Sequence, residues 1–150
     1  MRAVIQRVEK ASVVILENEI AKIERGLLVL LGIEIEDAKE DALWLASKIA
    51  ALRIFSDEKG VMNKSITELG GEVIVVSQFT LHAKTKKGNR PSYIKAARPE
   101  QAIALYQQFK EDLTLAIGRQ VQSGEFGAEM KVSLINDGPI TILIDTKNKE

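Results

Sequence analysis

Cysteine is absent from this 150-residue sequence, and histidine occurs only once, as His82. The absence of cysteine excludes disulfide bonds and thiolate chemistry. One histidine supplies too few ligands for a histidine-rich metal site, and a Ser-His-Asp triad would have to be built around this single residue. Any chemistry must therefore use other groups, and we expect neither a metal nor a cofactor.

Long apolar runs are also missing. No stretch reaches the roughly 18 consecutive apolar residues expected of a membrane-spanning helix. Charges are scattered through the opening segment, Met1 to Arg7, so we expect a cytosolic protein without a membrane partner. With 45% hydrophobic and 28% charged residues, residues 1–150 are expected to form a single domain with a substantial core.

Acidic residues are missing from one long interval. The formal net charge is zero, yet no Asp or Glu occurs between Glu72 and Glu100. The same interval contains six cations, which are Lys84, Lys86, Lys87, Arg90, Lys95 and Arg98. Glycine and proline residues punctuate it, so most of these cations should lie on a loop that could follow a phosphate backbone. The alternative is a solvated, lysine-rich loop without a partner.

Hydrophobic periodicity predicts a mixed-sheet α/β unit with two helices. Alternating or continuous apolar runs predict strands at Arg2–Val8, Ser12–Leu16, Ile20–Ile23, Leu27–Ile33 and Glu72–Phe79. The run Leu27–Ile33 should be central, because it is apolar on both faces. Capping signals and helical spacing predict helices from Asp37 to Leu52 and from near Pro99 until Gly118 ends the second. The polar segment Ser56–Gly71 should be a surface loop.

The segment Asn136 to Thr141 separates two alternating apolar stretches, Met130–Leu134 and Ile140–Ile144. An Asp-Gly pair between two such stretches predicts a hairpin turn. Pro139 follows Gly138 directly, and proline belongs at a strand start, an edge or a bulge because it has no N–H to donate. The local pattern therefore predicts a hairpin whose second strand opens at Pro139.

Hydroxyl and amide side chains gather where the strand Glu72–Phe79 ends. Ser77, Gln78 and Thr80 occupy this carboxyl end, which is where open α/β sheets bind ligands. The alternative is a strand end whose hydroxyl groups cap the following turn. His82 is a candidate base for Thr80, but side chains two residues apart on an extended chain share a face without necessarily touching.

Several separated motifs together resemble the D-aminoacyl-tRNA deacylase family. They are Ser77-Gln78-Phe79-Thr80-Leu81, Gly88-Asn89-Arg90-Pro91-Ser92-Tyr93, Phe126-Gly127-Ala128-Glu129-Met130, Asn136-Asp137-Gly138-Pro139-Ile140-Thr141 and the opening Met1 to Val8. The motifs occur in the family's order and extend along the whole chain. His82 departs from the family, which more often has a small or different residue there.

The resemblance implies a homodimeric hydrolase without a metal. Its substrate would be the ester that joins a D-amino acid, or glycine, to the 3′ end of transfer RNA. The implied fold is α/β with three layers, in which two packed mixed β-sheets form a barrel-like unit and two helices cover one side. The implied Gly138–Pro139 peptide is cis, and its carbonyl oxygens would enter the active site of the partner subunit.

The resemblance also implies roles for single residues. Backbone N–H groups near Phe79 and Thr80 would face the developing oxyanion, with Gln78 and Thr80 positioning groups and Ser77 shaping the pocket. On the substrate-binding side, Arg7 would brace the turn that contains Asn136, Gly138 and Pro139, and Phe126 would stack on the terminal adenine or belong to the core. Lys84, Lys86, Lys87 and Arg90 would bind the tRNA backbone.

Two other functions remain open from the sequence. A threonine esterase would form a covalent acyl-enzyme at Thr80, although no partner for its proton is evident. A non-catalytic RNA-binding module would use the lysine-rich loop and turn over nothing. Neither alternative explains the Gly138-Pro139 motif as well as the deacylase does.

Overall fold

The computed structural model describes residues 1–150 and contains eight β-strands, three α-helices and one 3₁₀ helix. The strands are β1 (Arg2–Ile15), β2 (Asn18–Ile23), β3 (Gly26–Gly32), β4 (Phe55–Ser56), β5 (Met62–Lys64), β6 (Glu72–Ser77), β7 (Gln122–Ser123) and β8 (Lys131–Asp145). The helices are α1 (Lys39–Ala51), α2 (Ile66–Leu69), η1 (Phe79–His82) and α3 (Pro99–Ile117). No helix is both long enough and apolar enough to cross a membrane.

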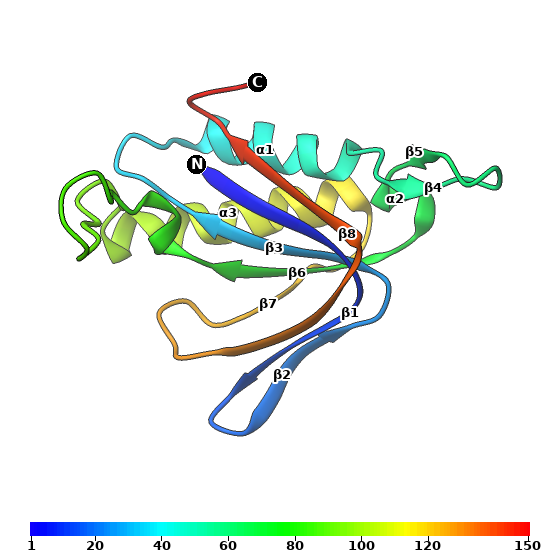
Figure 1. Ribbon diagram of the computed structural model, residues 1–150, viewed down its shortest axis with the longest axis horizontal. Coiled ribbons are helices and arrows are strands. Elements are labelled where there is room, and N and C mark those ends of the chain that lie inside the picture. Colours follow the sequence, from blue (N-terminus) through cyan, green and yellow to red (C-terminus); the bar gives the residue numbers. More distant parts are fainter.

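Six strands form one mixed sheet in the order β2-β1-β3-β6-β7, with β8 on the other edge of β1. The β1–β3 pair is antiparallel, whereas β3–β6 and β6–β7 are parallel. Strand β1 is long enough to pair with β3 near its start and with β2 near its end, so the sheet bends over on itself (Figure 1). The side chain of Gln122 in β7 donates to and accepts from the backbone of Lys22 in β2, which nearly closes a barrel.

The molecule has two apolar cores, one between the helices and the sheet and one inside the bent sheet. Leu27 and Val29 of β3 join the core beneath the helices, whereas Leu28 between them points into the second core inside the bent sheet. Strand β3 is thus covered on both faces, as predicted from its apolar run. Helices α1 and α3 cover the same side of the sheet (Figure 1). The predicted α/β class, with a barrel-like sheet and helices on one side, is confirmed.

Several predicted local elements need correction, and one is the strand predicted at 72–79, which ends at Ser77 because Phe79 already belongs to η1. The strands expected at 2–8 and 12–16 are one strand, β1, which ends in a turn where Leu16 and Glu17 have positive φ angles. The segment 56–71 is not only loop, because it contains β5 and the short helix α2. Helix α1 begins at Lys39 after an N-cap at Ala38, later than predicted. Asp37 does not cap it, since its carboxylate accepts hydrogen bonds from the buried Met1 ammonium and from the Glu34 N–H.

The predicted hairpin at Asn136–Thr141 is wrong. Both halves of β8 pair with the same strand, β1, in one antiparallel direction, and not with each other. Gln6 pairs with Thr141 and Val8 pairs with Asn136, so residues 137 to 140 bulge out opposite Arg7 alone. The alternation on either side of the bulge is the same as that of a hairpin, which is why the sequence pattern was misleading. The Gly138–Pro139 peptide in the bulge is cis, as the resemblance implied.

Candidate active site

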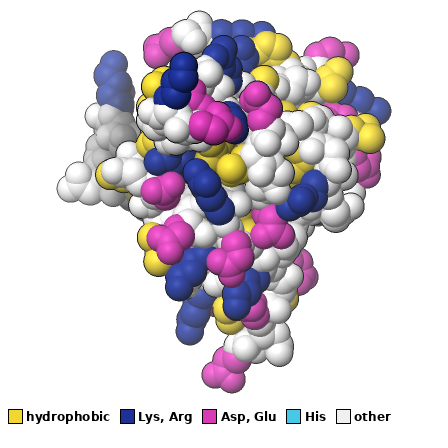
Figure 2. Space-filling model, turned by 90° about the vertical axis from the view of Figure 1, so that its right-hand side faces the viewer, with side chains coloured by type: hydrophobic (Ala, Val, Ile, Leu, Met, Phe, Trp, Pro, Cys, Tyr) yellow, Lys and Arg dark blue, Asp and Glu magenta, His cyan; other side chains and the backbone are white.

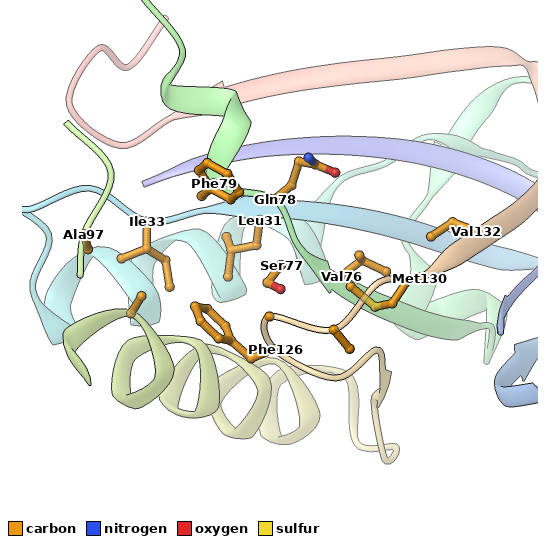
Figure 3. Close-up of a pocket in the computed structure, with 13 residues that line it drawn as sticks. Leu31, Ile33, Val76, Ser77, Gln78, Phe79, Ala97, Phe126, Met130 and Val132 are labelled. Atoms are coloured by element: carbon orange, nitrogen blue, oxygen red, sulfur yellow. The ribbon is translucent and has the colours of Figure 1, made fainter. Parts of the chain in front are cut away.

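A cavity of about 300 Å³ lies where β6 ends and η1 begins. Its lining residues are Leu31, Ile33, Val76, Ser77, Gln78, Phe79, Ala97, Ala102, Phe126, Gly127, Ala128, Met130 and Val132. Most of these side chains are apolar, and Ser77 and Phe126 face each other across the space (Figure 3). The structure therefore brings Ser77, Gln78, Phe79 and Phe126 to one cavity.

The end of β6 sets the backbone at this cavity. Gln78 extends the pairing with β3 by donating its N–H to the Leu31 carbonyl at 2.7 Å. Its own φ and ψ of −144° and 79° then leave the extended strand, and η1 starts at Phe79. The N–H groups of Phe79 and Thr80 open this helix, so they have no acceptor within its first turn. Such N–H groups are suitable donors to an anionic oxygen.

Thr80 is held by an amide and not by a base. The Gln78 side-chain amide donates to the Thr80 hydroxyl oxygen, and in Figure 3 the amide of Gln78 points away from Ser77. His82 is buried in η1, and neither of its ring nitrogens has a hydrogen-bond partner. The histidine therefore makes no contact with the Thr80 hydroxyl that would allow it to act as a base there.

Tyr106 of α3 supports the cavity, and the sequence analysis missed it. Its hydroxyl donates to the Val75 carbonyl in β6 at 2.9 Å, and its ring centroid lies 5.9 Å from that of Phe126. Burial raises the pKa of Tyr106 to about 12, even though Ser123 is close enough to lower it. The tyrosine is thus a neutral donor that ties α3 to the strand before Ser77. Its helical spacing looks like that of any core residue, so no local signal marks it.

The segment that carries Phe126 depends on a glycine. A Cβ added to Gly124 would lie 2.4 Å from the sulfur of Met130, so any side chain there would displace Met130 from the cavity wall. The Gly124 N–H also donates to the Val75 carbonyl at 3.0 Å. Gly124 therefore lets this segment pass close to both Met130 and β6, which presents Phe126 to the cavity.

The other predicted substrate-binding residues form a separate group around the β8 bulge. Arg7 donates from Nε to the Asp137 carbonyl at 3.1 Å and from Nη1 to the Ile54 carbonyl at 2.7 Å. Asn136 closes the bulge, because its side chain accepts from the Ile140 N–H at 2.9 Å and donates to the Thr141 hydroxyl. The bend of β8 and the carboxyl end of β6 lie on opposite sides of Figure 1. Within one chain, the bulge therefore takes no part in the cavity.

The predicted tRNA-binding cations lie beside the cavity, on the loop between η1 and α3. Lys84, Lys86, Lys87 and Arg90 are all exposed, and none of them forms an ion pair. Two backbone hydrogen bonds between Lys84 and Ser92 close the base of this loop. The opposite side of the molecule is different, because acidic and basic side chains are interspersed there (Figure 2).

Fold and cavity together define the class of protein. It is a mixed α/β, nearly closed barrel with a small, largely apolar cavity at the carboxyl end of a parallel strand, which is where such folds usually bind ligands. The D-Tyr-tRNA(Tyr) deacylase family profile matches residues 4–145.

Individual relatives agree with this match. A D-aminoacyl-tRNA deacylase from Bacteroides fragilis is 63% identical over the full length of both chains. A solved structure named c-Myc DNA Unwinding Element Binding Protein is 41% identical and has a TM-score of 0.92 over 97% of this chain and 98% of the other. Another, titled as a probable eukaryotic D-amino acid tRNA deacylase, is 17% identical with a TM-score of 0.81 over 95% and 97% of the two chains, which shows a shared fold. The chain belongs to the D-aminoacyl-tRNA deacylase family and is a hydrolase.

Proposed function

We propose that this protein hydrolyses the ester bond of D-aminoacyl-tRNA in the cytoplasm and releases the free D-amino acid and the tRNA. The observation that carries the proposal is the cavity at the start of η1, whose wall contains Ser77, Phe79 and the Phe126 ring but no nucleophile paired with a base. Family membership supports the same reaction. Residues 1–150 act as one domain in this proposal.

The reaction needs little from side chains, because an aminoacyl ester is already activated. A water molecule attacks the ester carbonyl carbon, and the N–H groups of Phe79 and Thr80 stabilise the negative oxygen that forms. The bond between the carbonyl carbon and the ribose oxygen then breaks, and the proton of the water passes to that oxygen. The neighbouring ribose 2′-hydroxyl is the group proposed to relay this proton. Gln78 and Thr80 hold the start of η1, and Ser77 limits the width of the cavity.

The remaining parts of the substrate have separate contacts in this proposal. The terminal adenine stacks on Phe126, whose ring points into the cavity (Figure 3). Lys84, Lys86, Lys87 and Arg90 bind backbone phosphates, so they confer affinity without reading the sequence of the tRNA.

Selection of the D configuration is assigned to a second copy of the chain. The bulge with Gly138 and Pro139 lies far from its own cavity, and the Arg7 and Asn136 hydrogen bonds hold it in shape. In a homodimer, the partner's bulge would enter the cavity and turn its carbonyl oxygens toward the α-carbon of the amino acid. These oxygens accept hydrogen bonds from the ammonium group and leave no space for a side chain in the L position.

The test compares D-alanyl-tRNA, glycyl-tRNA and L-alanyl-tRNA as substrates of the purified protein. The D-alanyl and glycyl esters should be hydrolysed, since neither places a side chain against the bulge, whereas the L-alanyl ester should be refused although it differs from glycyl by one methyl group. Spontaneous hydrolysis without protein is the control. Comparable rates with D- and L-alanyl-tRNA would refute selection by exclusion.

Nucleic-acid binding without turnover is the second candidate. The exposed, unpaired cations of the loop 84–90 favour it, and the solved relative that is 41% identical has the name of a DNA-binding protein. The same assay decides between the two functions. Tight binding of tRNA with no release of any amino acid would support the binding function and reject the hydrolase.

A further inference from the structure

Two aromatic rings lie exposed at the outer end of the cavity. Phe79 is 55% exposed and Tyr93 is 37% exposed, and their ring centroids are 5.0 Å apart in an edge-to-face arrangement. Phe79 lines the cavity, whereas Tyr93 does not. The pair therefore extends the aromatic surface of the cavity outward into solvent. Exposed aromatic rings that lie next to each other offer apolar surface that another molecule can cover.

The backbone around Tyr93 is anchored at several points. Ser92 is paired with Lys84 by two hydrogen bonds, and the Tyr93 carbonyl accepts from the Ala96 N–H at 3.0 Å. The next residues return to the end of β3, where the Ile33 carbonyl accepts from the Ala97 N–H at 2.9 Å. Tyr93 is thus presented by a fixed turn, so a ligand would find its ring already in position.

The charged residues of the chain segment that carries both rings have one sign. Lys84 lies opposite Ser92, the neighbour of Tyr93, and Lys95 follows two residues later. Both lysines are exposed, neither forms an ion pair, and residues 73–99 contain no Asp or Glu. Exposed aromatic rings among unpaired cations are the combination that binds unpaired nucleotides, whose bases stack while their phosphates meet the cations. A protein partner would have no comparable need for the cations.

We propose that Phe79 and Tyr93 form a stacking platform for an unpaired nucleotide that precedes the terminal adenosine of the tRNA. The proposal rests on the proposed function, because it assumes that the cavity holds the terminal aminoacyl-adenosine. Only the single-stranded 3′ end of tRNA offers free base faces at this distance from the ester, since bases in the acceptor stem are already stacked and paired. Lys84 and Lys95 bind the phosphates on either side of the stacked base.

The experiment uses two substrates, D-alanyl-tRNA and the D-alanyl ester of adenosine alone. Tyr93→Ala should lower kcat/KM for the tRNA substrate about 5- to 150-fold, which corresponds to the loss of one stacked base. The adenosine ester has no preceding nucleotide, so its hydrolysis should change less than about two-fold. Tyr93→Phe keeps the ring and should behave like the parent with both substrates.

Ile94→Ala is the matched control, because Ile94 is 70% exposed, apolar and adjacent to Tyr93. It should leave both activities unchanged, and thermal unfolding should show the same midpoint for all three variants. If Tyr93→Ala is as active as the parent on tRNA, or loses activity equally on both substrates, the platform is refuted. If the parent hydrolyses neither substrate, the proposed function fails, and this outcome differs from failure of the platform.

Discussion

The Thr80 hydroxyl has a partner that suits a positioning residue better than a nucleophile. Its oxygen accepts a hydrogen bond from the Gln78 amide, and the buried His82 has no hydrogen-bond partner at all. A threonine without a base nearby is a weak nucleophile. The hydroxyl is therefore better suited to holding the first turn of η1, which contains the proposed oxyanion donors.

Replacing Thr80 by alanine should accordingly weaken the enzyme without abolishing its activity. The loss of one hydrogen bond of ordinary strength predicts a fall in kcat of about 2- to 10-fold on D-aminoacyl-tRNA. Single-turnover kinetics and mass spectrometry of the quenched parent enzyme are the measurements. Complete loss of activity in the variant, together with an acyl group found on Thr80 of the parent, would establish the covalent mechanism instead.

The hydroxyl of Tyr106 should stabilise the fold in a way that depends on pH. Tyr106→Phe removes the donor to the Val75 carbonyl, which keeps the Gly124 N–H as a second donor, so the free energy of unfolding should fall by about 0.5–1.5 kcal/mol. Burial raises the pKa of Tyr106 from 10.0 to about 12, so its contribution is complete below pH 10 and is lost as the pH rises toward 12. Urea unfolding of parent and variant should give curves that converge over this range. A stability difference that stays constant from pH 9 to pH 12 would contradict this linkage.

At the scale of single residues, the sequence predicted part of the cavity wall but not its support. Ser77, Gln78 and Phe79 could be placed because they follow an apolar strand directly, and strand ends in α/β proteins collect ligands. Tyr106 could not be placed, because its role depends on a carbonyl in β6, which is 31 residues away along the chain. The periodicity of a helix indicates which face is buried and gives no information about a particular acceptor.

At the scale of elements, β8 is the strand that was predicted wrongly, since the sequence pattern indicated a hairpin in its place. A hairpin and a bulged single strand have the same alternation on either side of an Asp-Gly turn signal, and only pairing with β1 distinguishes them. That pairing is decided by residues at the other end of the chain. The burial of β3 and β6 was predicted correctly, because a continuous apolar run is itself evidence of burial on both faces, although Phe79 at the end of the second predicted strand belongs to η1.

The bulge of β8 depends on Arg7 of β1 for its shape. Arg7→Lys keeps the charge but cannot reach the carbonyls of both Asp137 and Ile54, so the free energy of unfolding should fall by about 1.5–3 kcal/mol. Deacylation should fall as well, since the proposed selection depends on a fixed bulge. Arg119→Lys is the matched control, because Arg119 is exposed and forms no ion pair, so its change should alter stability by less than about 0.5 kcal/mol. Equal stability of Arg7→Lys and the parent would show that the bulge holds its shape unaided.

At the scale of the whole molecule, the net charge is zero but the charges are unevenly distributed over the surface. All charged residues of the loop between η1 and α3 are basic, whereas the face on the opposite side of the molecule carries both acidic and basic side chains (Figure 2). The cavity, the aromatic pair and the cations all lie at the same end of the sheet. A long anionic ligand whose reacting group enters the cavity would therefore extend along the cationic loop, while the rest of the chain, in which acidic residues outnumber basic ones, would repel it.

This arrangement predicts a steep dependence of tRNA binding on salt. If three or four phosphates are neutralised, the affinity should fall by about 40- to 150-fold between 50 and 200 mM salt. Lys86→Ala combined with Lys87→Ala should flatten the plot of log affinity against log salt, because fewer counterions are released on binding. Lys10→Ala combined with Lys22→Ala is the matched control, since both lysines are exposed on the β1–β2 hairpin and form no ion pair. The control pair should leave the slope unchanged, and fluorescence titration of labelled tRNA at four salt concentrations measures it. A parent slope near zero, or one that the Lys86 and Lys87 changes leave intact, would mean that this loop does not face the RNA.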